Sequence, residues 1–205
     1  MKKSALLVVA ALGTAVTGAL WWRKNPSACP YGQRWSVTVP HPLITRSRLK
    51  DALRPIAGER LLEIGPGTGY YSLDAAEWVG PEGSLDIFDI QQDMLDHTME
   101  QAGERGLSNI TPTLGDAQQL DYETGSFDGA FLVTTLGEIP DQTAAVHELA
   151  RVVRPGGRIV VGELMGDPHW VSPRSIRAHA DSACLTVERR LGPWFGSFTV
   201  LRKPV

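Results

Sequence analysis

The sequence is poor in cysteine and has no long run of basic residues. Its 205 residues contain two cysteines, Cys29 and Cys184, which lie far apart and form no C-x-x-C pair. We therefore expect neither a zinc site nor a disulfide framework, and this cysteine usage suits a reducing compartment. A formal net charge of −3 without a basic run argues against a nucleic-acid partner.

The chain also lacks internal repeats and low-complexity segments. With 42% hydrophobic and 21% charged residues, its composition is that of a globular protein and excludes wholesale disorder. A length of 205 residues fits one α/β domain with a short appendage.

The N-terminal 24 residues have the pattern of a membrane anchor. Lys2 and Lys3 precede an uncharged, mostly apolar run of 18 residues, Ala5–Trp22, which ends in two tryptophans and is followed by Arg23 and Lys24. A helix of that length spans roughly 27 Å, close to the thickness of a hydrocarbon core, and the tryptophans lie where an aromatic belt belongs. We predict an uncleaved anchor. A cleaved secretory signal is the open alternative, since the two lysines resemble an n-region.

A connector over residues 25–42 separates this segment from the domain predicted over residues 43–205. Thr45 is placed to cap a short basic helix, Arg46–Leu53. The cations of this helix either face anionic lipid headgroups or form a solvated helix face.

From Arg60 onward, strand and helix patterns alternate, as in a parallel sheet covered by helices on both faces. We therefore predict an α/β, Rossmann-like fold with a seven-stranded, mostly parallel sheet. The first expected strand begins at Arg60. The other six cover residues 84–90, 110–114, 129–134, 158–164, 185–191 and 197–202. Two expected helices cover residues 70–79 and 92–104. Two more begin directly after Asp141 and after Ser172.

A glycine-rich turn directly after the first strand is the strongest sequence signal. Its glycines are Gly65, Gly67 and Gly69. Compared with the dinucleotide pattern G-x-G-x-x-G, the third glycine comes one residue early, and Pro66 has no N–H for a phosphate. The turn therefore suits a nucleoside ligand without phosphates. A glycine-rich turn that binds nothing is the alternative.

Acidic residues stand at the ends of the first three strands. Asp89 follows Gly69 by twenty positions, where a carboxylate can accept both hydroxyls of a ribose. Asp116 follows the third strand, where it can accept the exocyclic amine of an adenine. A single aspartate at a strand end is more often a helix cap, but three acids in this order, with Glu63 in the first strand, favour a nucleoside site.

These motifs resemble those of class I S-adenosylmethionine-dependent methyltransferases, and the resemblance covers about Leu43 to Arg202. The quinone-biosynthesis and phospholipid methyltransferases are the most similar groups. The matching stretches are Glu63–Gly69, Phe88–Leu95, Gly115–Ala117, Ser126–Asp128 and Arg154–Arg158.

The resemblance implies S-adenosylmethionine as the cofactor and no metal. It implies that the three glycines pass beneath the methionine part and that Glu63 orders its amino end. It further implies that Ile90 and Ala117 pack against the adenine, with Asp89 on the ribose and Asp116 at the adenine edge.

Methyl transfer from a sulfonium is an in-line displacement, so positioning is the main contribution of the protein, worth up to ~7–11 kcal/mol. A carbon or weakly acidic oxygen nucleophile also needs a general base. The candidate catalytic residues are Glu138 and His169, which follow the fourth and fifth strands. For His169, a packed loop residue is an equally good interpretation. Tyr70 and Tyr71 are candidates for contact with cofactor or acceptor.

We therefore expect a membrane-tethered methyltransferase that acts on a small, lipophilic acceptor. Because S-adenosylmethionine is made inside the cell, we expect the catalytic domain on the cytoplasmic side. A nicotinamide-dependent oxidoreductase and a non-catalytic nucleoside-binding protein are the alternatives.

Overall fold

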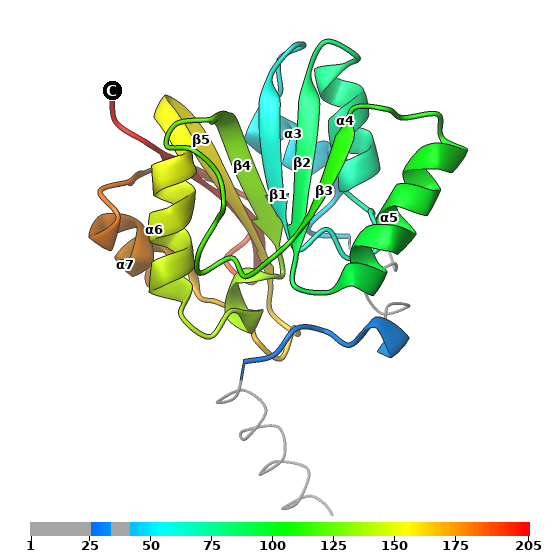
Figure 1. Cartoon of the computed structure of the whole chain (residues 1–205). Coiled ribbons are helices and arrows are strands. Elements are labelled where there is room, and N and C mark those ends of the chain that lie inside the picture. The colour runs from blue at the N-terminus through cyan, green and yellow to red at the C-terminus, as the bar shows by residue number, and fades with distance from the viewer. Residues whose placement is uncertain (1–25, 34–41) are drawn as a thin grey trace, which may run out of the picture.

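The computed structural model describes residues 26–33 and 42–205 (Figure 1). The predicted anchor over residues 1–24 lies outside the described residues, as does half of the predicted connector. Among the residues that are described, no helix has both the length and the apolar character needed to cross a membrane.

Seven strands form one sheet in the order β3-β2-β1-β4-β5-β7-β6. Strands β1 to β5 are parallel, whereas β7 runs antiparallel to both of its neighbours. The Rossmann-like, mostly parallel sheet predicted from the sequence is confirmed. The strands are β1 Arg60–Ile64, β2 Ser84–Asp89, β3 Ile110–Leu114, β4 Phe127–Val133, β5 Val153–Leu164, β6 Thr186–Leu191 and β7 Gly196–Arg202.

Helices cover both faces of the sheet (Figure 1). On one face α3 (Arg46–Leu53), α4 (Ser72–Val79) and α5 (Gln92–Glu104) bury their apolar side chains. On the other face lie α6 (Gln142–Val152) and α7 (Pro173–Ser182). Two single-turn helices, η1 (Tyr31–Gln33) and η2 (Leu136–Glu138), lie in loops at one end of the sheet.

The structure confirms the three side chains that were predicted to cap helix N-termini. The carboxylate of Asp141 accepts a hydrogen bond from the amide of Ala144 at 2.9 Å, which satisfies one free N–H in the first turn of α6. Ser172 does the same for α7, and Thr45 for α3. At α6, the apolar spacing then buries Val146 and Leu149 against the sheet.

Three elements begin two or more residues away from their predicted starts. Helix α4 begins at Ser72 rather than residue 70, because the glycine-rich turn continues through the first two positions. Strand β4 begins earlier, at Phe127, and β5 at Val153 rather than residue 158. The four residues Arg154–Gly157 are an irregularity between two paired positions, since Phe127 pairs with Val153 and Gly129 with Arg158.

A buried ion pair fastens α3 to the sheet. Both terminal nitrogens of Arg158 in β5 bind the carboxylate of Glu59, with Nη1 2.6 Å from Oε1. The Nε of Arg158 donates to the carbonyl of Leu53, the last residue of α3. This pair holds the N-terminal part of the domain at the amino ends of the strands.

Candidate active site

A cavity of about 830 Å³ lies at the carboxyl edge of the sheet. Loops that follow β1 to β5 line it together with the N-terminal segment 26–33, which lies across this edge in Figure 1. In open α/β sheets this edge is where ligands bind. The predicted site residues among those that line it are Gly65, Gly67, Asp89, Ile90, Asp116, Ala117, Glu138 and His169.

The glycine-rich turn forms one wall of the cavity. Gly65, Gly67 and Gly69 all have positive φ, at 69°, 56° and 79°, a conformation that glycine adopts without steric cost. A Cβ on Gly65 would lie 2.5 Å from the side chain of Thr135, so this glycine is also required by close packing. Gly69 lies outside the cavity lining, and a Cβ there would meet Thr98 of α5 at 3.0 Å. The third glycine therefore also allows close packing of the turn against α5.

Glu63 lies within β1 beneath the turn and does not line the cavity. Its side chain is buried, and its Oε2 has no hydrogen-bond partner among the described residues. Burial raises the pKa of this carboxyl to about 8; the nearby Ser72 hydroxyl opposes the shift, and the charge of Asp89 adds to it. The buried carboxyl lies beneath the turn, where it can order the loop that would hold a methionine moiety.

Asp89 and Ile90 form the neighbouring wall, at the end of β2. The Oδ1 of Asp89 accepts a hydrogen bond from the amide of Gln91 at 2.9 Å. Burial raises the pKa of Asp89 to about 6, against the opposing effect of backbone N–H groups. Ile90 is 60% exposed although it is a large apolar residue, which fits a surface for a flat ring.

Asp116 and Ala117 follow β3 on the same side. Both carboxylate oxygens of Asp116 already accept hydrogen bonds from Gln118, from its amide at 2.9 Å and from its side-chain nitrogen at 2.7 Å. These contacts fix the turn, and each oxygen keeps a second lone pair for a ligand. Ala117 packs against the buried core and so presents a firm surface to the cavity.

Glu138 and His169, the two candidate catalytic residues, line the cavity from adjacent loops. A Cβ on Gly137 would lie 1.6 Å from the carbonyl oxygen of His169, so the two loops are in direct contact. The amide of His169 donates to Asp167 at 2.7 Å, which fixes the second loop. Burial raises the pKa of Glu138 to about 8, with further contributions from Asp167 and Asp89. Such a group is placed to accept a proton near neutral pH.

Cys29 and Gln91 join the site without having been predicted. The amide of Cys29 donates to Oε2 of Glu138 at 3.3 Å, and the side chain of Gln91 donates to the carbonyl of Cys29 at 3.0 Å. Segment 26–33 is therefore part of the cavity wall rather than a simple connector. No local pattern in the sequence indicates these contacts.

Glu163, at the end of β5, is a further buried carboxyl that the sequence reasoning missed. Its Oε2 accepts a hydrogen bond from the amide of Val171 at 3.0 Å, and its Oε1 has no partner among the described residues. Burial raises its pKa to about 8, and repulsion from Asp167 and Glu138 acts in the same direction. The strand pattern around Glu163 did not indicate a buried carboxyl at this position.

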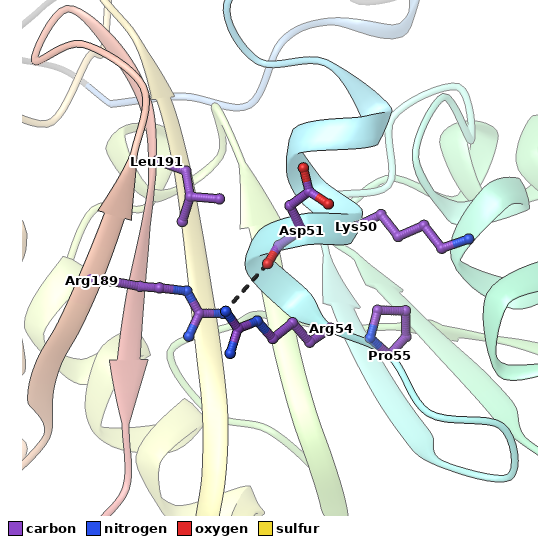
Figure 2. A pocket seen from close by; sticks show the side chains of 6 residues that line it. All are labelled: Lys50, Asp51, Arg54, Pro55, Arg189 and Leu191. Carbon is purple, nitrogen blue, oxygen red and sulfur yellow. Dashed lines mark hydrogen bonds between the residues drawn. The ribbon is translucent and has the colours of Figure 1, made fainter.

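A second, shallower depression lies between α3 and β6 (Figure 2) and is lined by Lys50, Asp51, Arg54, Pro55, Arg189 and Leu191. Arg189 donates to the carbonyls of Asp51 and Ala52, so its guanidinium joins the edge strand to the helix. Lys50 lies 5.5 Å above the ring of Trp78 and points away from Arg189. Lys50, one of the cations of the predicted basic helix, therefore contacts an aromatic ring of the domain.

The sheet order, the cavity and the glycine-rich turn define a class I methyltransferase fold. Residues 61–157 match the family model described as "Methyltransferase domain". The fold resembles the crystal structure of a SAM-dependent methyltransferase from Aquifex aeolicus, with a TM-score of 0.78 and 18% identity, covering 87% of this chain and all of the other.

Curated relatives match over the same region. The chain is 38% identical to nocamycin O-methyltransferase of Saccharothrix syringae over 112 residues, which are 55% of this chain and 40% of the relative. It is 32% identical to demethylmenaquinone methyltransferase of Lactococcus lactis over 115 residues, 56% of this chain and 46% of the relative. The chain spans about half the length of the curated relatives it matches. These relatives are methyltransferases that share about half of this chain, and the similarity to the Aquifex aeolicus structure extends the shared fold over most of the chain.

Proposed function

We propose that this protein transfers a methyl group from S-adenosylmethionine to a small, lipophilic, quinone-like acceptor. The observation that carries the proposal is the single cavity in which Gly65, Gly67, Asp89 and Asp116 face Glu138. The names of the relatives support the choice of acceptor, since they include a demethylmenaquinone methyltransferase and an aklanonic acid methyltransferase.

The cofactor supplies an activated methyl group, and the residues of this chain supply its position. In the proposed arrangement Asp89 accepts hydrogen bonds from the ribose, while Asp116 lies at the adenine edge beside Ile90 and Ala117. Glu63, buried beneath the turn, is proposed to order the amino end of the methionine part. Gly65 and Gly67 keep the turn free of side chains where the methionine part lies.

Glu138 acts as the general base in this proposal. Transfer of a methyl cation to a quinol-type carbon or hydroxyl releases one proton, and the carboxylate of Glu138 accepts it. Its raised pKa, about 8, makes it a stronger base than an ordinary glutamate. His169 contacts the same loop and is proposed to border the acceptor.

Two measurements test this function. Calorimetry with S-adenosylhomocysteine and with NADH should detect binding of the first and none of the second. Turnover should follow when S-adenosylmethionine is supplied with a soluble, short-chain demethylmenaquinone analogue. Binding of NADH in place of S-adenosylhomocysteine would favour an oxidoreductase, and binding without turnover on any quinone or polyketide acceptor would contradict the proposed substrate class.

The membrane placement is part of the same proposal. The apolar run Ala5–Trp22 is proposed to anchor the protein, with the catalytic domain of residues 43–205 in the cytoplasm and the connector of residues 25–42 between them. A tether beside the bilayer raises the effective concentration of a lipophilic acceptor. Protease added to spheroplasts should leave the domain intact, and deletion of residues 2–24 should preserve cofactor binding but impair turnover in cells. Digestion from outside, or a truncated chain with full cellular activity, would contradict this placement.

A further inference from the structure

Large apolar side chains are exposed mainly at one edge of the molecule. Seven large hydrophobic residues are exposed in the described part of the chain, and five of them lie at the carboxyl edge, around the cavity. These five are Ile90, Leu114, Met165, Trp194 and Phe195. Of the other two, Ile56 lies in the turn before β1, at the opposite edge, and Val205 is the C-terminal residue.

Three of these residues form a continuous apolar patch, which we call the aromatic patch: Met165, Trp194 and Phe195. Their exposed fractions are 44%, 53% and 40%. The ring centroid of Trp194 lies 5.7 Å from that of Phe195 and 6.3 Å from that of Trp170, and both pairs are edge-on. The amide of Met165 donates to the carbonyl of Phe195 at 2.7 Å, which joins the β6–β7 turn to the loop after β5.

The turn that carries Trp194 and Phe195 is closely packed. At the base of the turn, a Cβ on Gly192 would lie 2.6 Å from the carbonyl oxygen of Gly196. A Cβ on Gly196 would lie 2.7 Å from the side chain of Leu43. The turn is therefore packed tightly against the body of the domain while its aromatic rings point outward, so the exposure does not come from a loosely attached loop.

The aromatic patch adjoins the mouth of the cavity. Leu164 and Gly166, on either side of Met165, both line the cavity, and so does Pro26 on the N-terminal segment. Only three residues separate Pro26 from Trp22, the end of the apolar run in the sequence. Pro26 and the patch thus border the same opening.

We infer that the aromatic patch is a membrane-contact surface that seats the mouth of the cavity on a lipid bilayer. Tryptophan and phenylalanine beside a polar domain suit the interfacial region of a bilayer, where an apolar ring is buried at headgroup depth. The inference rests on the proposed function, because a lipophilic acceptor would then pass from the bilayer into the cavity without crossing water.

Fluorescence quenching tests the contact directly in the full-length protein. The protein is reconstituted in phosphatidylcholine vesicles with or without brominated acyl chains, and Trp194→Phe is compared with Trp78→Phe, which removes a half-buried tryptophan of α4. We expect Trp194→Phe to remove quenched emission and Trp78→Phe to remove unquenched emission. If the emission lost with Trp194 is not quenched, because a second copy or another segment covers the patch, the inference is wrong.

Turnover provides the second readout. We expect the double variant Trp194→Ser/Phe195→Ser to raise the apparent KM for a long-chain demethylmenaquinone embedded in vesicles about tenfold. Its KM for a soluble short-chain analogue should stay unchanged, and Ile56→Ser, at the opposite edge, should change neither. Equal effects on both acceptors would overturn the inference. If the wild-type protein methylates neither acceptor, the proposed function fails, while the quenching experiment still decides the membrane contact.

Discussion

The backbone amide of Cys29 donates a hydrogen bond to the carboxylate of Glu138 at 3.3 Å, although 109 positions separate the two residues. The contact places segment 26–33 over the loop that follows β4 and encloses Glu138 within the cavity. Enclosure is the main reason why the pKa of this carboxyl is raised, and the hydrogen bond from Cys29 opposes that shift. The N-terminal segment therefore shapes the chemistry of the site as well as its wall.

Removal of the Asp89 carboxylate should weaken the cofactor site without unfolding the domain. Asp89→Ala deletes the proposed acceptor for the ribose hydroxyls, and loss of a buried hydrogen-bonding partner costs about 1–3 kcal/mol. In calorimetry we expect the free energy of binding S-adenosylhomocysteine to become less favourable by about that amount, with a correspondingly higher Kd. Asp93→Ala, at an exposed position of α5, is the matched control and should bind as the wild type does. Unchanged affinity in Asp89→Ala would remove the ribose assignment.

The glycine-rich turn allows a sharper test through a pair of substitutions. Gly65→Ala introduces a Cβ 2.5 Å from Thr135 and a side chain at a φ of 69°. We expect the variant to fold but to bind S-adenosylhomocysteine at least about tenfold more weakly, because the turn must shift. Gly65→Ala/Thr135→Ala removes the two atoms at 2.5 Å, and leaves only the Cβ of residue 135 at 3.0 Å, so it should recover part of the affinity. Recovery would be absent if Thr135 were not the residue that Gly65 accommodates.

The buried pair of Arg158 and Glu59 should be important for stability and not for binding. Arg158→Met leaves the carboxylate of Glu59 buried without its cation, which typically costs about 3–5 kcal/mol. Urea denaturation should show this loss. Arg154→Met breaks the more exposed ion pair with Asp128 and should cost about 1 kcal/mol or less. A similar loss in both variants would mean that burial does not distinguish the pairs.

The sequence predicted those features that depend on neighbouring residues. The turn Gly65–Gly69, the acids at strand ends and the caps Asp141 and Ser172 are local patterns, and the structure contains them at the expected positions. The cavity wall from segment 26–33 could not be predicted, because it depends on the contact between Cys29 and Glu138. Glu163 was missed for a related reason, since only the folded chain shows that the end of β5 is covered.

Glu163 should make stability depend on pH. In the unfolded chain a glutamate titrates near its ordinary pKa of 4.5, whereas in the native protein the pKa of Glu163 is about 8. Between these values the native state keeps a proton that the unfolded state has lost, so the free energy of unfolding falls as pH rises towards 8. Glu163→Gln should reduce this loss by about 1 kcal/mol or more between pH 6 and 8.5 in urea denaturation. Glu100→Gln, at an exposed position of α5, should leave the slope unchanged.

Glu138 should set the pH dependence of turnover. As a general base it must be ionised, and with a pKa of about 8 it is mostly protonated at pH 6. We therefore expect kcat to rise with pH and to level off above about 8, whereas a glutamate with an ordinary pKa would give a flat profile over this range. Glu138→Gln cannot accept the proton, so it should lower kcat by about 10²- to 10⁴-fold and abolish the inflection.

Binding measurements separate this role of Glu138 from a structural one. Glu138→Gln keeps an oxygen that can accept the hydrogen bond from Cys29, so we expect its affinity for S-adenosylhomocysteine to remain close to that of the wild type. Glu138→Asp retains a carboxylate but withdraws it from the cavity, and should restore a pH-dependent profile at reduced kcat. If Glu138→Gln keeps full turnover while His169→Ala loses it, His169 rather than Glu138 is the base, since both line the same cavity.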